Sequence, residues 1–66
     1  MPEYQELTDS EKNQIKINAI RNLEYQMYSL EIEIVAENAK SEPDEERLLI
    51  LNQKISELES QILAIQ

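Results

Sequence analysis

The sequence predicts an all-α protein, an antiparallel two-helix hairpin that self-associates into a helical bundle. Three features of the chain point to this class. Its 66 residues include no glycine, so the tight turns of β-sheets lack the residue that adopts positive φ without strain. Glu, Leu and Gln, which favour helices, are abundant. Apolar residues recur at steps of three and four, and Pro43 marks the one plausible internal break in this pattern.

The first helix is expected over residues 9–39, after a leader at residues 1–8. Thr8 and Glu11 have the spacing of a capping box, in which each side chain accepts a hydrogen bond from the other residue's backbone N–H. At its other end no glycine is present to form the usual C-cap, so we expect Asn38 or Lys40 to take that place. At about 1.5 Å per residue this helix is about 46 Å long.

Two rows of side chains follow opposite sides of this helix. The seam row, which we expect to pack against the second helix, consists of Ile20, Leu23, Met27, Leu30 and Ile34. The outer row consists of Ile17, Arg21, Tyr25, Tyr28, Ile32, Val35 and Ala39. A helix with one partner needs only one apolar row. We therefore expect the outer row to contact a second copy of the chain, with a dimer favoured, or another helical protein.

The second helix is expected over residues 44–66, after a turn at 40–43. Ser41 is its expected N-cap and Pro43 lies in its first turn, with acidic residues near the positive end of the helix dipole. Its seam row is Leu48, Leu51, Ile55, Leu58 and Ile62. So short a turn forces the helices antiparallel. Because the first helix is the longer one, about two of its turns, from Asp9 to Lys16, extend beyond the end of the second. Tyr4 and Leu7 of the leader are expected to cap the open end of the seam.

The composition restricts the classes of partner and cofactor. The chain has no Cys and no His, which excludes disulfides and the commonest zinc sites. A net charge of −8 opposes binding to nucleic acids and anionic membranes. The longest apolar run is four residues, far fewer than the ~20 that span a bilayer. We expect no cofactor, no nucleic acid or membrane partner, and a cytoplasmic protein.

No constellation typical of catalysis is present. Glu33 and Glu37 are one helical turn apart, but neither a His nor a glycine-bearing calcium loop accompanies them. We interpret them as a solvated helix flank. The serines have no neighbouring base to activate them. The sequence therefore predicts a non-enzymatic protein with no catalytic and no metal-binding residues.

Arg21, Tyr25 and Tyr28 lie at positions i, i+4 and i+7 and form one patch of the outer row. A guanidinium over a phenol ring is compatible with stacking on a nucleotide base and with a subunit interface. Ile32 and Val35 continue the same face with no polar function. This continuation favours the interface.

Two segments of the first half, Tyr4-Gln5-Glu6-Leu7-Thr8-Asp9-Ser10-Glu11-Lys12 and Arg21-Asn22-Leu23-Glu24-Tyr25-Gln26-Met27-Tyr28, resemble small uncharacterised proteins of tailed bacteriophages, particularly marine cyanophages. This resemblance implies a viral accessory or assembly role, in the infected cell's cytoplasm or in the virion. The leader is also similar to phage anti-defence proteins that form helical hairpins and sequester cyclic dinucleotides between subunits. That second similarity implies a ligand site at Tyr4, Lys12 and Lys16.

The leading expectation is therefore an oligomeric structural or interaction protein, acting through helix–helix packing without a small-molecule ligand. The alternative is an oligomer that sequesters cyclic dinucleotides.

Overall fold

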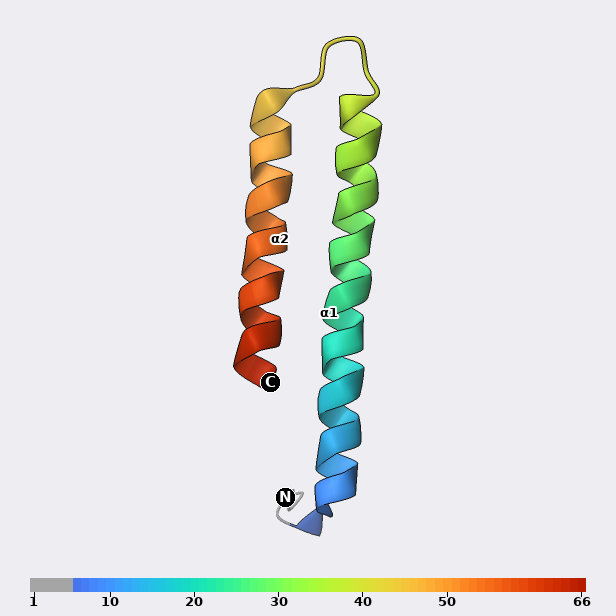
Figure 1. Ribbon diagram of the computed structural model, residues 1–66, viewed down its shortest axis with the longest axis vertical. Helices are drawn as coiled ribbons and strands as arrows, with labels where there is room; N and C mark the ends of the chain where they lie inside the picture. The colour runs from blue at the N-terminus through green and yellow to red at the C-terminus, as the bar shows by residue number, and fades with distance from the viewer. Residues whose placement is uncertain (1–5) are drawn as a thin grey trace.

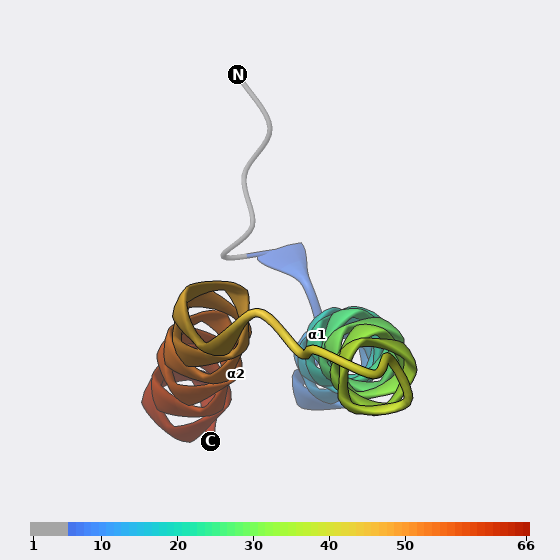
Figure 2. The same cartoon turned by 90° about the horizontal axis from the view of Figure 1, so that it is seen from above.

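The computed structural model describes residues 6–66, which form two helices joined by a short turn. Helix α1 is Asp9–Asn38 and helix α2 is Glu45–Ile65. The helices lie side by side and antiparallel in one layer, and α1 continues past the C-terminal end of α2 (Figures 1 and 2). The predicted all-α hairpin is thus confirmed. Among the described residues, neither helix combines the length and the hydropathy needed to cross a bilayer.

The N-terminus of α1 has the expected capping box. The Thr8 hydroxyl accepts a hydrogen bond from the Glu11 backbone N–H at 3.0 Å, and the Glu11 carboxylate accepts one from the Thr8 N–H at 2.9 Å. Both hydrogen bonds satisfy donors that the first turn of a helix otherwise leaves without partners. They also lower the pKa of Glu11, because hydrogen bonds to a carboxylate favour its ionised form.

The C-terminus of α1 differs from the expectation in its cap and by one residue in its length. The helix ends at Asn38 and its C-cap is Ala39, which keeps right-handed helical angles (φ −77°, ψ −11°). Among the described residues none has a positive φ, so neither Asn38 nor Lys40 replaces the missing glycine. Instead the backbone tightens, because the Lys40 N–H donates to the Glu37 carbonyl at 3.2 Å.

The start of α2 corrects a second expectation. Asp44, rather than Ser41, is the N-cap, and its carboxylate accepts hydrogen bonds from the N–H groups of Glu46 and Arg47 at 3.0 and 3.2 Å. Pro43 therefore precedes the helix and is not part of its first turn. The residue before a proline is disfavoured in the helical conformation, so Glu42 is a poor first helical residue and Ser41 a poor N-cap. Asp44 is the first position after Pro43 with a capping side chain.

The interior of the hairpin is a single row of contacts between the two helices. Leu51 and Leu58 of α2 are its buried apolar residues, and Leu51 is only 4% exposed. The remaining seam-row residues are all half-buried, namely Ile20, Leu23, Met27, Leu30, Ile34, Leu48, Ile55 and Ile62. Each of them is covered from one direction only, because a two-helix layer has solvent on both of its faces.

Leu58 should contribute much more to stability than an equally apolar residue on the outside of α2. We expect Leu58→Ala to lower the free energy of unfolding by about 2 kcal/mol or more, because it removes buried methyl groups and leaves a cavity. Leu63 is 71% exposed on the same helix, so Leu63→Ala is the matched control and should change stability by less than about 0.5 kcal/mol. Urea unfolding followed by circular dichroism at one protein concentration measures both. Equal effects would contradict the assigned interior.

Candidate functional site

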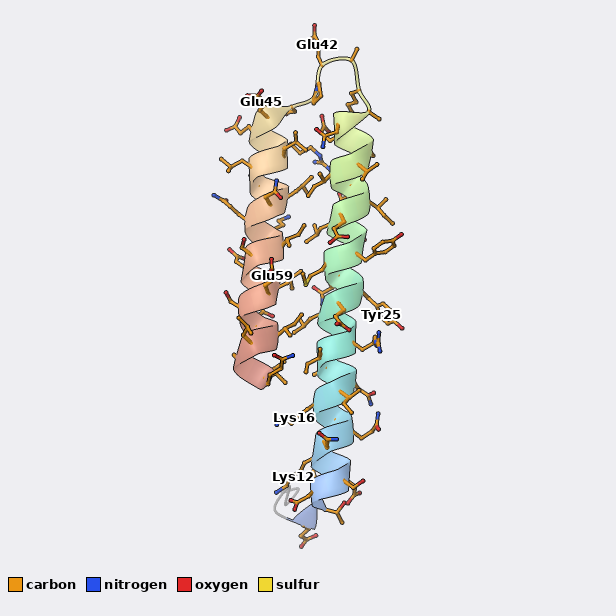
Figure 3. The ribbon with its side chains drawn as sticks, viewed as in Figure 1. Lys12, Lys16, Tyr25, Glu42, Glu45 and Glu59 are labelled. Atoms are coloured by element: carbon orange, nitrogen blue, oxygen red, sulfur yellow. The ribbon has the colours of Figure 1, made fainter. Side chains whose placement is uncertain are left out.

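The outer row of α1 is exposed along its whole length. Tyr25 and Val35 are each 69% exposed, and Ile32 is 53% exposed. Ile17, Arg21, Tyr28 and Ala39 are exposed as well. Figure 3 shows Tyr25 pointing away from α2. The structure therefore separates the two rows as their spacing indicates, with the seam row against α2 and the outer row in water.

The outer row contains a hollow of about 270 Å³ whose lining residues all belong to α1. Four residues at positions i, i+3, i+4 and i+7 surround it, namely Tyr28, Glu31, Ile32 and Val35. This is the arrangement of four residues that accepts one side chain of a facing helix in knobs-into-holes packing. Arg21, two turns closer to the N-terminus, lies near Glu24, with 3.6 Å between its Nη1 and the Glu24 Oε1. The hollow suits a helical partner.

A second hollow of about 350 Å³ follows the seam between the helices. Leu30 and Leu58 provide its apolar part, and its other lining residues are polar, namely Gln26, Ser29, Lys54, Glu57 and Gln61. It is wide open to solvent. Glu57 is the one carboxylate among its lining residues. It has the character of an ordinary groove between two packed helices.

Glu37 has a structural role that its sequence pattern does not indicate. The sequence predicts a solvated flank here, but Glu37 is only 3% exposed and lies beneath the turn. Its Oε2 accepts a hydrogen bond from the Asp44 N–H at 2.8 Å, and its Oε1 accepts one from the Lys40 Nζ at 3.0 Å. The Arg47 Nε lies 3.5 Å from the same Oε1. One carboxylate thus connects the end of α1, the turn and the first turn of α2.

Glu33 extends this cluster to the surface, where its Oε1 accepts a hydrogen bond from the Arg47 Nη2 at 3.1 Å. Arg47 therefore bridges Glu33 and Glu37 from the opposite helix. The hydrogen bond from the Asp44 backbone and that from Lys40 lower the pKa of Glu37, and the charges of Lys40 and Arg47 act in the same direction. The i, i+4 spacing of the two glutamates was visible in the sequence. Their pairing with Arg47 depends on how the turn closes.

Two of the three residues of the nucleotide-binding alternative lie within the described residues. Lys12 and Lys16 are exposed on the part of α1 that extends beyond α2, and both lie on the same side of α1 as α2 (Figure 3). Tyr4 lies outside the described residues. Leu7, the other expected cap residue, is half-buried. Within residues 6–66, no three His, Cys, Asp or Glu side chains are placed to hold a metal ion.

Comparison of the chain with protein-family models, with curated proteins and with solved structures finds no match.

Glu37→Gln should lower the urea midpoint of unfolding at neutral pH. The substitution keeps the size of the side chain but removes the charge that faces Lys40 and Arg47. Glu59→Gln is the matched control, since Glu59 is exposed on α2 and the change in net charge is the same. Circular dichroism should find a lower midpoint for Glu37→Gln alone. Similar midpoints for the two variants would show that the buried carboxylate does not stabilise the turn.

The contribution of Glu37 should also disappear in acid. Its pKa is lowered by folding, so the stabilisation is fully present above the ordinary glutamate pKa of about 4.3. It is lost as the pH falls through the lower pKa of the folded state. The pKa of Glu11 is also lowered by folding, so Glu11 contributes to the pH dependence in the same direction. Both proteins contain Glu11, so the difference in unfolding free energy between the wild type and Glu37→Gln reports on Glu37 alone. A difference that stays constant from pH 7 down to pH 2 would contradict the assignment.

Proposed function

We propose that the chain is a non-enzymatic helix–helix interaction protein that acts as a homodimer, with the outer row of α1 as its interface. The observation that carries this proposal is the exposed outer row with its four-residue hollow. Tyr and Arg are enriched at protein interfaces, and both types occur here among aliphatic residues. The second copy packs its own outer row against this one, so that α1 of each chain lies at the centre of a four-helix assembly.

The amount of exposed surface supports a second copy as the partner. The chain exposes 5514 Å², whereas a compact protein of 7.8 kDa is expected to expose about 4,400 Å². The excess is similar to the ~800 Å² that each partner contributes to an interface of ordinary size. The hairpin is also elongated. Its Cα radius of gyration is 16.7 Å, whereas a compact chain of this length has about 11 Å.

The net charge of −8 opposes this association, so the dimer depends on burial of apolar surface. Added salt screens the repulsion between two acidic chains, and we expect it to strengthen the dimer. The resemblance of the first half of the chain to small phage proteins supports an accessory or assembly role in the cytoplasm of an infected cell, with a helical phage or host protein as a further partner of the dimer.

Ile32→Glu should dissociate the dimer and keep the hairpin helical. Ile32 is 53% exposed in the single chain and lies in the proposed interface, where the substitution places a carboxylate. We expect the dissociation constant of the dimer to rise about 30-fold or more. Leu63→Glu on α2 makes the same change in charge at a residue that is exposed but outside the outer row. Light scattering after size exclusion compares the two variants with the wild type.

A wild-type protein that remains a 7.8 kDa monomer at high micromolar concentration and high salt would refute the dimer. Equal weakening by Ile32→Glu and Leu63→Glu would place the interface elsewhere. Leu30→Glu provides a contrast, since Leu30 is half-buried on the seam row. That variant should lose helical structure, because an unpaired charge in the seam disfavours the folded hairpin.

We expect no binding of cyclic dinucleotides at micromolar concentration. The net charge repels phosphates, and Lys12 and Lys16 are the only two basic side chains on the part of α1 that extends beyond α2. Isothermal titration calorimetry with a set of cyclic dinucleotides tests this expectation. Binding that disappears in Lys16→Ala would support the sequestration function and count against a purely structural role.

A further inference from the structure

The hollow of the outer row contains a charge that restricts what can fill it. It is lined by Tyr28, Ile32 and Val35 and by one acidic residue, Glu31. A cationic group on an aliphatic stem fits such a mixed lining, because its methylene groups contact the apolar residues while its charge faces a carboxylate and an aromatic ring. Arginine is the residue that combines these properties best.

The outer row supplies one such residue, Arg21. Its side chain is 64% exposed and has a contact of 3.6 Å with Glu24 on its own helix. The hollow and Arg21 lie on the same face of α1, with Arg21 on the N-terminal side of Tyr25 and the hollow on its C-terminal side. They cannot meet within one chain, because Glu31 lies ten residues, about 15 Å along the helix, from Arg21. Two copies can bring them together.

We propose that the second copy packs antiparallel on the outer row, with Arg21 of each chain seated in the hollow of the other and paired with its Glu31. This inference rests on the homodimer proposed above and adds its orientation and register. With Ile17 of one copy opposite Val35 of the second, Arg21 falls opposite Glu31. The two-fold axis then passes near Tyr25 and Tyr28, whose rings form the centre of the interface.

A parallel arrangement lacks this complementarity. It places each residue beside its own copy, so that Arg21 faces Arg21 and Glu31 faces Glu31, which repel one another. Both hollows then face each other and neither is filled. The antiparallel arrangement exchanges each of these like-charged contacts for an opposite-charged one.

The charges along the hairpin favour the same orientation. The end near the turn, residues 31–47, carries seven acidic and two basic residues, whereas residues 6–21 carry three of each. The labelled side chains in Figure 3 show these two ends, with Glu42 and Glu45 at one and Lys12 and Lys16 at the other. Parallel packing places two strongly acidic ends side by side. Antiparallel packing places each acidic end beside a neutral one.

Spin labels distinguish the two orientations, and because the chain has no Cys, a single introduced Cys defines the labelled position. A label at Ser10→Cys should be about 50 Å from its copy in the antiparallel dimer and within about 25 Å in a parallel one, given 1.5 Å per residue and helix axes 8–10 Å apart. A label at Ser29→Cys, close to the proposed axis, should lie within about 25 Å of its copy in either orientation. Pulsed electron paramagnetic resonance measures both distances.

A long Ser10 distance with a short Ser29 distance supports the proposal. Short distances at both positions would overturn the antiparallel orientation and leave the homodimer intact. The absence of any intermolecular distance at Ser29, together with a monomeric mass, would overturn the homodimer and with it this inference.

Charge reversal tests the register. Arg21→Glu and Glu31→Arg should each raise the dimer dissociation constant by about tenfold or more, and the double variant should recover most of that loss. Lys54→Glu and Glu57→Arg on α2 make the same changes in net charge outside the outer row and should leave the dissociation constant within about threefold of the wild type. Analytical ultracentrifugation at low salt measures all five variants. Failure of the double variant to recover would overturn the Arg21–Glu31 pairing.

Discussion

A hairpin of two helices has only one interhelical contact, and the rest of this structure follows from that constraint. One seam buries Leu51 and Leu58 and covers the other seam-row residues from one side. Within residues 6–66 no element covers the opposite face of α1, although it has a comparable number of apolar residues. A 66-residue chain with so thin an interior gains stability chiefly by burying more surface against another chain. The outer row is where such surface is available.

The turn joins the two helices at one end of this seam. Glu37 is buried at the point where the chain reverses, and it accepts hydrogen bonds from the Asp44 backbone and from Lys40. A buried carboxylate is tolerated only when its charge is compensated, and here Lys40 and Arg47 provide the compensation. This cluster joins the last turn of α1 to the N-cap of α2. It fixes where α2 starts, and hence which α2 residues face the seam row of α1.

The distribution of charge connects the fold with the proposed assembly. The acidic residues that favour the start of α2 through the helix dipole also make the turn end of the hairpin strongly negative. The opposite end of α1 is balanced, and Arg21 is the cation of the outer row. A feature that helps the local structure of one chain therefore also restricts how two chains can approach. The orientation proposed for the dimer follows from charges that also favour the local structure of each chain.

The sequence alone determined the fold class, the two apolar rows of α1 and its capping box. These depend on spacing within one helix, and the 3.6-residue period converts spacing directly into direction. The tertiary structure decided the start of α2 and the role of Glu37. Ser41 and Asp44 are both suitable N-caps by residue type, and the choice between them depends on Pro43 and on the hydrogen bond from the Asp44 N–H to Glu37, seven residues earlier. In the sequence Glu37 has the same pattern as its exposed neighbours, because its burial results from the path of the turn above it and from Arg47 on the opposite helix.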